Sequence, residues 1–97
     1  MVETEIITKY FIANQKLTNL VNEKINFLHR IDPTIKSAEI VLTKNDNSEY
    51  IELTIYAGHG IYFTKCSSCP FEKIIDNAIE NVISEIQGME SISRITS

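Results

Sequence analysis

Residues 49–57 read Glu-Tyr-Ile-Glu-Leu-Thr-Ile-Tyr-Ala, and this strict alternation decides how the neighbouring chain can fold. The apolar residues that share one side of an extended backbone are Ile51, Leu53, Ile55 and Ala57. The residues on the other side are Tyr50, Glu52, Thr54 and Tyr56. A period of two is typical of a strand that covers a hydrophobic core with one face and meets solvent with the other.

Three further segments are expected to be strands of the same sheet. Residues 36–44 also alternate, and the polar turn 44–48 joins them to residues 49–57. Residues 61–65 follow a second turn, Gly58-His59-Gly60. Residues 3–11 are rich in β-branched and aromatic types. The two short turns predict an antiparallel meander, with residues 3–11 added as a fourth strand.

Two segments with a period near 3.6 residues predict helices. The longer apolar series consists of Phe71, Ile74, Ile75, Ala78, Ile79, Val82, Ile83 and Ile86. Pro70 suits the first position of this helix, and Gly88 suits the residue just past its end.

The other helix is expected over residues 14–31. Asn14 is its predicted N-cap, and Asp32-Pro33 ends it because proline disfavours the helical region at the preceding residue. Its apolar stripe contains Leu17, Leu20, Val21, Leu28 and Ile31, with Ile25 and Phe27 at the edges.

The resulting order is β-α-β-β-β-α. The first strand and the second are expected to be parallel, because a crossover through a helix is right-handed and returns the chain in the same direction. Both helices then cover one face of a four-stranded mixed sheet, which gives a two-layer α+β sandwich. We expect residues 1–88 to form this single domain and residues 89–97 to form a flexible C-terminal tail.

The composition limits the kind of protein that this chain can be. Its 97 residues are 43% hydrophobic and carry 9 basic against 13 acidic side chains, a net charge of -4. This balance counts against strong nonspecific binding of nucleic acid, although it leaves room for a local basic patch. With no apolar run long enough to cross a membrane and no visible signal peptide, a cytoplasmic location is expected.

Cys66-Ser67-Ser68-Cys69 admits three interpretations. It is a polar loop, a redox dithiol whose second thiol lies at a helix N-terminus, or half of a metal site. The polar loop is the expectation, because one such pair carries little information and neither His29 nor His59 has zinc-finger spacing to it. We therefore expect no metal and no cofactor.

An enzyme has little support in the sequence. No nucleophile elbow, P-loop, dinucleotide fingerprint or zinc-protease motif is present. Glu49 and Glu52 lie on opposite faces of their strand, so they are not a paired-carboxylate site.

The tyrosines suggest a binding face. Tyr50 and Tyr56 are expected on the open face of the sheet, with Tyr62 joining them. There they could stack on RNA bases or form a protein interface, and the alternative is ordinary β-propensity on a half-exposed sheet.

Diffuse motifs resemble those of the ribosome hibernation-promoting factor family, which includes ribosome-associated inhibitor A and the sigma-54 modulation proteins. The resemblance covers about residues 4 to 87. The stretches that carry it are Phe11–Leu17, Val21–Ile25, Leu28–Ile31, Phe71-Glu72 and Ile75–Glu80. It implies the same β-α-β-β-β-α fold and a non-enzymatic factor that binds the RNA channel of the small ribosomal subunit and inhibits translation. This chain would be a short member, without a C-terminal dimerisation domain.

The resemblance also implies RNA-binding residues. Lys24, Arg30 and Lys65 match basic positions of the family, and Lys9, Lys16 and Lys73 are added as neighbouring cations. Asn81 and Ser84 stand where the family usually has basic residues, so the second helix carries a net negative charge. The alternative is therefore a diverged paralogue that binds protein, or forms a homodimer, through the open face with Tyr50, Tyr56 and Tyr62.

Overall fold

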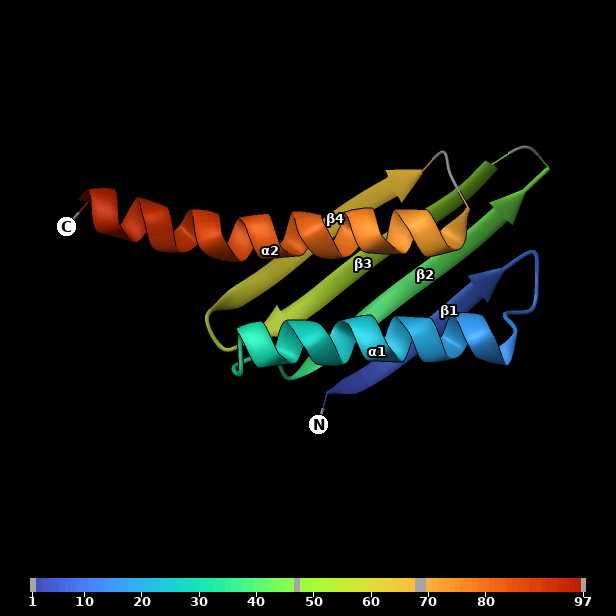
Figure 1. Cartoon of the computed structure of the whole chain (residues 1–97), viewed down its shortest axis with the longest axis horizontal. Helices are drawn as coiled ribbons and strands as arrows, with labels where there is room; N and C mark the ends of the chain where they lie inside the picture. Colours follow the sequence, from blue (N-terminus) through green and yellow to red (C-terminus); the bar gives the residue numbers. More distant parts are fainter. Residues whose placement is uncertain (1, 47, 68–69, 97) are drawn as a thin grey trace.

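Figure 1 shows a four-stranded sheet with two helices on one of its faces. It is a computed structural model that describes residues 2–46, 48–67 and 70–96. The elements are β1 (Glu3–Lys9), α1 (Gln15–Ile31), β2 (Ser37–Asn45), β3 (Ser48–Ala57), β4 (Gly60–Ser67) and α2 (Phe71–Thr96). The strands lie in the order β1-β2-β3-β4, with β1 parallel to β2 and the other neighbours antiparallel. The predicted fold class and element order are therefore confirmed.

The strand register lines up the open-face residues in rows across the sheet. One row at the β3–β4 turn contains Glu3, Ser37, Tyr56 and Ile61. The row at the opposite end contains Lys9, Thr43, Tyr50 and Ser67. Because directly paired residues point to the same face, each row is a set of neighbouring side chains.

The covered face of the sheet and the two helices enclose one hydrophobic core. Ile51, Leu53 and Ile55 are buried from β3, as their alternation predicts. On α1 the buried residues are Leu17, Val21, Ile25 and Leu28. The prediction was wrong in part: Ile31, expected within the stripe, is 38% exposed, whereas Ile25 at its edge is only 1% exposed. At 100° per residue, positions 17, 21, 25 and 28 define the side that meets the sheet, and position 31 turns away from it.

Local side-chain chemistry sets both ends of α1. The Leu17 backbone N–H donates to Asn14 Oδ1 at 2.8 Å, so the predicted N-cap is confirmed. At the other end the Asp32 N–H still donates to the Leu28 carbonyl, and Asp32 itself has extended backbone angles before Pro33. The helix therefore ends where proline forbids another turn.

The second helix differs from its predicted bounds. Pro70 precedes it, and the Pro70 carbonyl accepts from the Lys73 and Ile74 N–H groups, so Pro70 is a cap rather than a first helical residue. The predicted end at Gly88 is also wrong, because α2 continues to Thr96. Gly88 does not adopt the positive φ that would close a helix there, and a glycine inside a helix costs only about 1 kcal/mol. The flexibility of residues 89–97 stays a prediction.

Candidate nucleic-acid interface

The six basic residues expected to bind RNA do not form one patch. Lys9 and Lys65 lie on the open face of the sheet, in neighbouring rows. Lys16, Lys24, Arg30 and Lys73 lie on the two helices of the other layer. The sheet therefore separates Lys65 from Lys24 and Arg30, the two residues with which the family resemblance groups it.

Lys24 is engaged by the neighbouring helix. Its Nζ lies 3.1 Å from Oδ1 of Asp76, and both side chains are partly exposed. An exposed ion pair of this kind stabilises the fold by only about 0–1 kcal/mol, but the carboxylate offsets the positive charge that Lys24 offers to an incoming phosphate. Farther along α2, partial burial raises the pKa of the Glu85 carboxyl above its ordinary value.

Arg30 belongs to the last turn of α1, at the far end of the molecule from Lys9 and Lys65. Its guanidinium carbon lies 5.8 Å from the ring centre of Phe27, which is itself 43% exposed. The arginine therefore forms a cation–π contact on the helix surface and adds nothing to a patch at the other end.

Five lysines do gather at one end of the molecule, which we call the basic end. The carboxyl ends of β1, β2 and β4 and the amino ends of both helices lie there (Figure 1). The lysines at these ends of the elements are Lys9 and Lys65 on the open face, and Lys16, Lys44 and Lys73 on the side of the helices. The acidic residues of the same segments are Asp46, Glu49, Glu52 and Glu72. The positive ends of two helix dipoles add to the excess of cations.

Lys44 was missed in the sequence. It stands near the end of β2, and nothing in the local pattern distinguishes it from an ordinary solvated lysine. Only the parallel pairing of β1 with β2, in which Lys9 opposes Thr43, shows that Lys44 and Lys9 end neighbouring strands. The parallel register is therefore the signal that could have found it.

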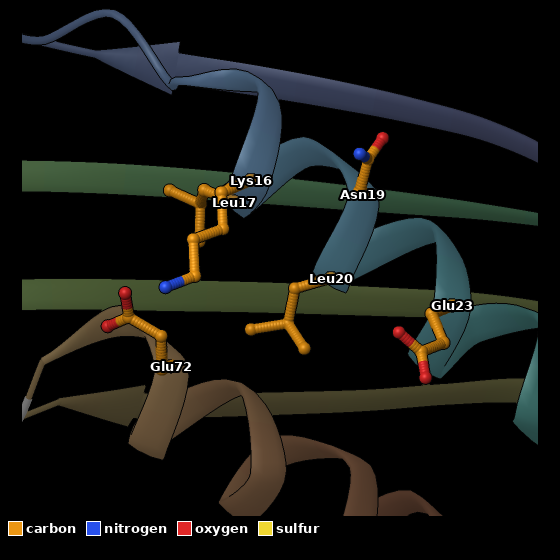
Figure 2. Close-up of a pocket in the computed structure, with 6 residues that line it drawn as sticks. All are labelled: Lys16, Leu17, Asn19, Leu20, Glu23 and Glu72. Carbon is orange, nitrogen blue, oxygen red and sulfur yellow. The ribbon is translucent and has the colours of Figure 1, made fainter.

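A groove separates the first turns of the two helices (Figure 2). Leu17 and Leu20 supply its apolar part, while Asn19 and Glu23 line it from α1. Lys16 extends across the groove toward Glu72 at the start of α2. The charge of Lys16 is thus partly offset by Glu72. Lys44 and Lys65 are directly paired with Glu49 and Glu52 across the sheet, whereas Lys9 is paired with the uncharged Thr43, so Lys9 is the freest of these cations.

The tyrosines divide between the two faces of the sheet. Tyr50 is half-buried and Tyr56 is 39% exposed on the open face, where both were expected. The expectation for Tyr62 was wrong: it is 2% exposed and pairs with the buried Ile55. The two-residue turn after Ala57 places Tyr62 on the covered face and sends Ile61 and Phe63 outward.

Of the segment Cys66-Ser67-Ser68-Cys69, the structure describes Cys66 and Ser67. Cys66 is a free, half-buried thiol, and Asn81 Nδ2 lies 3.4 Å from its Sγ. Cys69 lies outside the described residues, so the redox and metal interpretations, like the expected absence of a cofactor, stay predictions. Within the described ranges, no group of three or more His, Cys, Asp or Glu side chains is placed to hold a metal ion.

No family model and no curated protein matches this sequence. Two solved structures share its fold. A ribosomal subunit interface protein from Coxiella burnetii is 14% identical, with a TM-score of 0.80 over 93% of this chain and 99% of that one. The N-terminal domain of Thermus thermophilus Protein Y is 16% identical, with a TM-score of 0.81 over 92% and 99%. Both names agree with the family that the sequence resembles. At these identities the likeness establishes the fold.

Proposed function

We propose that this protein is a non-enzymatic, cytoplasmic translation inhibitor of the hibernation type that binds RNA of the small ribosomal subunit. The gathering of five lysines and two helix N-termini at the basic end carries the proposal. Lysines that neutralise phosphates supply most of the affinity in such complexes, and the fold sets the shape that fits the RNA. The shared fold with a ribosomal subunit interface protein supports the same function.

The proposal assigns unequal roles to the cations. Lys9, whose cross-strand partner is the uncharged Thr43, is expected to make the principal phosphate contact, with Lys16, Lys44, Lys65 and Lys73 beside it. Lys24 and Arg30 are expected to contribute less, because Lys24 is paired with Asp76 and Arg30 lies at the other end. The acidic surface of α2 would face away from the RNA.

Co-sedimentation with small ribosomal subunits over a series of salt concentrations tests this. The double variant Lys9→Ala/Lys44→Ala should weaken binding and lower the slope of log K against log salt by about one for each lysine–phosphate pair that the variant removes. Lys36→Ala is the matched control, because Lys36 is an exposed lysine just before β2, away from the basic end. Absence of co-sedimentation at low salt, or equal losses in both variants, would refute the proposal.

A second candidate, the protein-binding or homodimerising module, is favoured by one observation. Tyr56 and Ile61 are direct cross-strand neighbours on the open face, and Phe63 follows on β4. Ile61 is 64% exposed and Phe63 is 51% exposed. Contiguous exposed apolar side chains of this kind mark interaction sites. Light scattering of the purified chain tests the homodimer: a dimer that Phe63→Thr dissociates would support it, and a monomer at high concentration would oppose it.

A further inference from the structure

Tyr10 is the only described residue other than glycine with a positive φ, and its side chain is 82% exposed. A φ of 71° is uncommon for a bulky L-residue and costs about 1–2 kcal/mol. Asparagine or glycine would adopt this conformation more easily. Neither the strained backbone nor the exposed ring of Tyr10 stabilises the fold. Strained residues of this kind are common at binding sites, so Tyr10 is a candidate binding residue.

The surroundings of Tyr10 hold it in this conformation. The next residue, Phe11, turns inward, and its ring stacks on Phe71 with 5.0 Å between ring centres and 19° between planes. Three residues later Asn14 caps α1. The chain must reverse between β1 and α1 while placing Phe11 in the core, so Tyr10 is directed outward by the packing of its neighbour.

Tyr10 forms one wall of a cleft against the β2–β3 hairpin. The other residues that line the cleft are Lys44, Asn45, Asp46 and Ser48. Lys9 precedes Tyr10 at the end of β1, where it opposes Thr43 of β2. Lys44, Asn45 and Asp46 therefore share the cleft with the ring, while Lys9 lies beside it on the open face of the sheet.

We propose that this cleft binds one unpaired base of single-stranded RNA. The base stacks on the Tyr10 ring, while Lys44 within the cleft and Lys9 on the adjoining open face hold the phosphates on either side of it. Stacking on aromatic rings combined with cations along the backbone is the usual way in which proteins bind single strands. Asn45 and Asp46 offer acceptors for an amino group on the base edge, as acidic side chains do for cytosine. This inference rests on the proposed function and adds to it a single-stranded contact at a defined ring.

Tyr10→Asn is the decisive variant, because asparagine removes the ring and tolerates positive φ. It should fold with at least wild-type stability, so a binding loss would not reflect unfolding. Tyr10→Phe keeps the ring and should bind like the wild type. Phe27→Asn is the matched control, since Phe27 is an exposed aromatic residue in the second half of α1, away from the cleft.

The measurement is fluorescence anisotropy at low salt with a short labelled oligocytidylate and an abasic strand of the same length. Wild-type protein should prefer the strand that carries bases. Tyr10→Asn should lose about 5- to 150-fold in affinity for it, the range for one base–aromatic stack, and should bind the abasic strand unchanged. Phe27→Asn should retain the wild-type preference.

Several outcomes would overturn the inference. Wild-type protein that binds both strands equally, or neither, has no base site. A Tyr10→Asn variant that binds like the wild type shows that the ring is not used. If Tyr10→Asn weakens ribosome co-sedimentation but not oligonucleotide binding, the ring contacts a ribosomal protein instead. In each of these cases, co-sedimentation of the wild-type protein with the small ribosomal subunit would still support the proposed function. A wild-type protein that does not co-sediment would refute the proposed function, independently of the Tyr10 result.

Discussion

His59 lies in the turn between β3 and β4, and its Nε2 atom is 3.4 Å from Oδ2 of Asp32, the C-cap residue of α1. The same nitrogen lies 2.7 Å from the hydroxyl of Tyr62. Asp32 Oδ1 accepts from the N–H and the hydroxyl of Thr34, at 3.1 and 2.7 Å. This cluster joins the C-terminus of α1 to the β3–β4 turn. It lies on the side of the molecule opposite to the basic end.

We expect Asp32→Ala to lower the free energy of unfolding by about 2–3 kcal/mol, because it removes a buried carboxylate with its two Thr34 hydrogen bonds and its His59 contact. Urea denaturation measures the loss. Asp46→Ala removes an exposed carboxylate and should change stability by less than about 0.5 kcal/mol. Equal effects of the two substitutions would show that the cluster has no special part in the fold.

Gly58 and Gly60 are expected to differ in their tolerance of alanine. A Cβ atom at Gly58 would lie 3.0 Å from Cβ of Thr34, whereas a Cβ at Gly60 would meet nothing within 4 Å. Gly58→Ala should therefore destabilise the protein by about 1–3 kcal/mol through overpacking against the loop after α1. Gly60→Ala should change the thermal midpoint little, and a large decrease there would contradict the close approach as the cause.

Phe11 and Ile12 form a matched pair of large side chains in the segment between β1 and α1. Phe11→Ala removes the stack on Phe71 and should cost about 1–3 kcal/mol in chemical denaturation. Ile12 is 94% exposed, so Ile12→Ala should lie within about 0.5 kcal/mol of the wild type. If Ile12→Ala were the more damaging change, the inward position of Phe11 would be wrong.

Gly88→Ala tests the length of α2. Nothing lies within 4 Å of the added methyl, and alanine is favoured over glycine inside a helix by about 0.5–1 kcal/mol. Amide hydrogen exchange should therefore slow in the residues around position 88. Unchanged exchange would instead favour the flexible tail over residues 89–97 that the sequence predicts.

Much of the fold could be predicted because its signals are local. A period of two along 49–57 and a period near 3.6 along 71–86 each depend on residues a few positions apart, as does the Asn14 cap. Tyr62 shows where this fails. In Ile61-Tyr62-Phe63 all three residues suit a strand, so composition cannot say which face is buried, and the register against Ile55 decides it.

The candidate site was harder to predict. The family resemblance directs attention to Lys24, Arg30 and Lys65, but the structure pairs Lys24 with Asp76 and places Lys65 on the other layer. Lys44 lies beside Tyr10 only because β1 and β2 run parallel and finish at the same end of the sheet. Charge has no sequence period comparable to that of apolar residues, so its clustering depends on which elements meet.

The sequence by itself determined the order of elements, the two apolar faces that enclose the core, and the unusual acidity of the second helix. Burial of apolar side chains drives folding, and the pattern of that burial is set residue by residue along each element. Only the tertiary structure decided which lysines stand together, that Asp32 meets His59, and that the Tyr10 ring faces solvent beside Lys44. Those relationships join segments far apart in the chain, and their distances follow from the strand register and the crossing of the helices over the sheet.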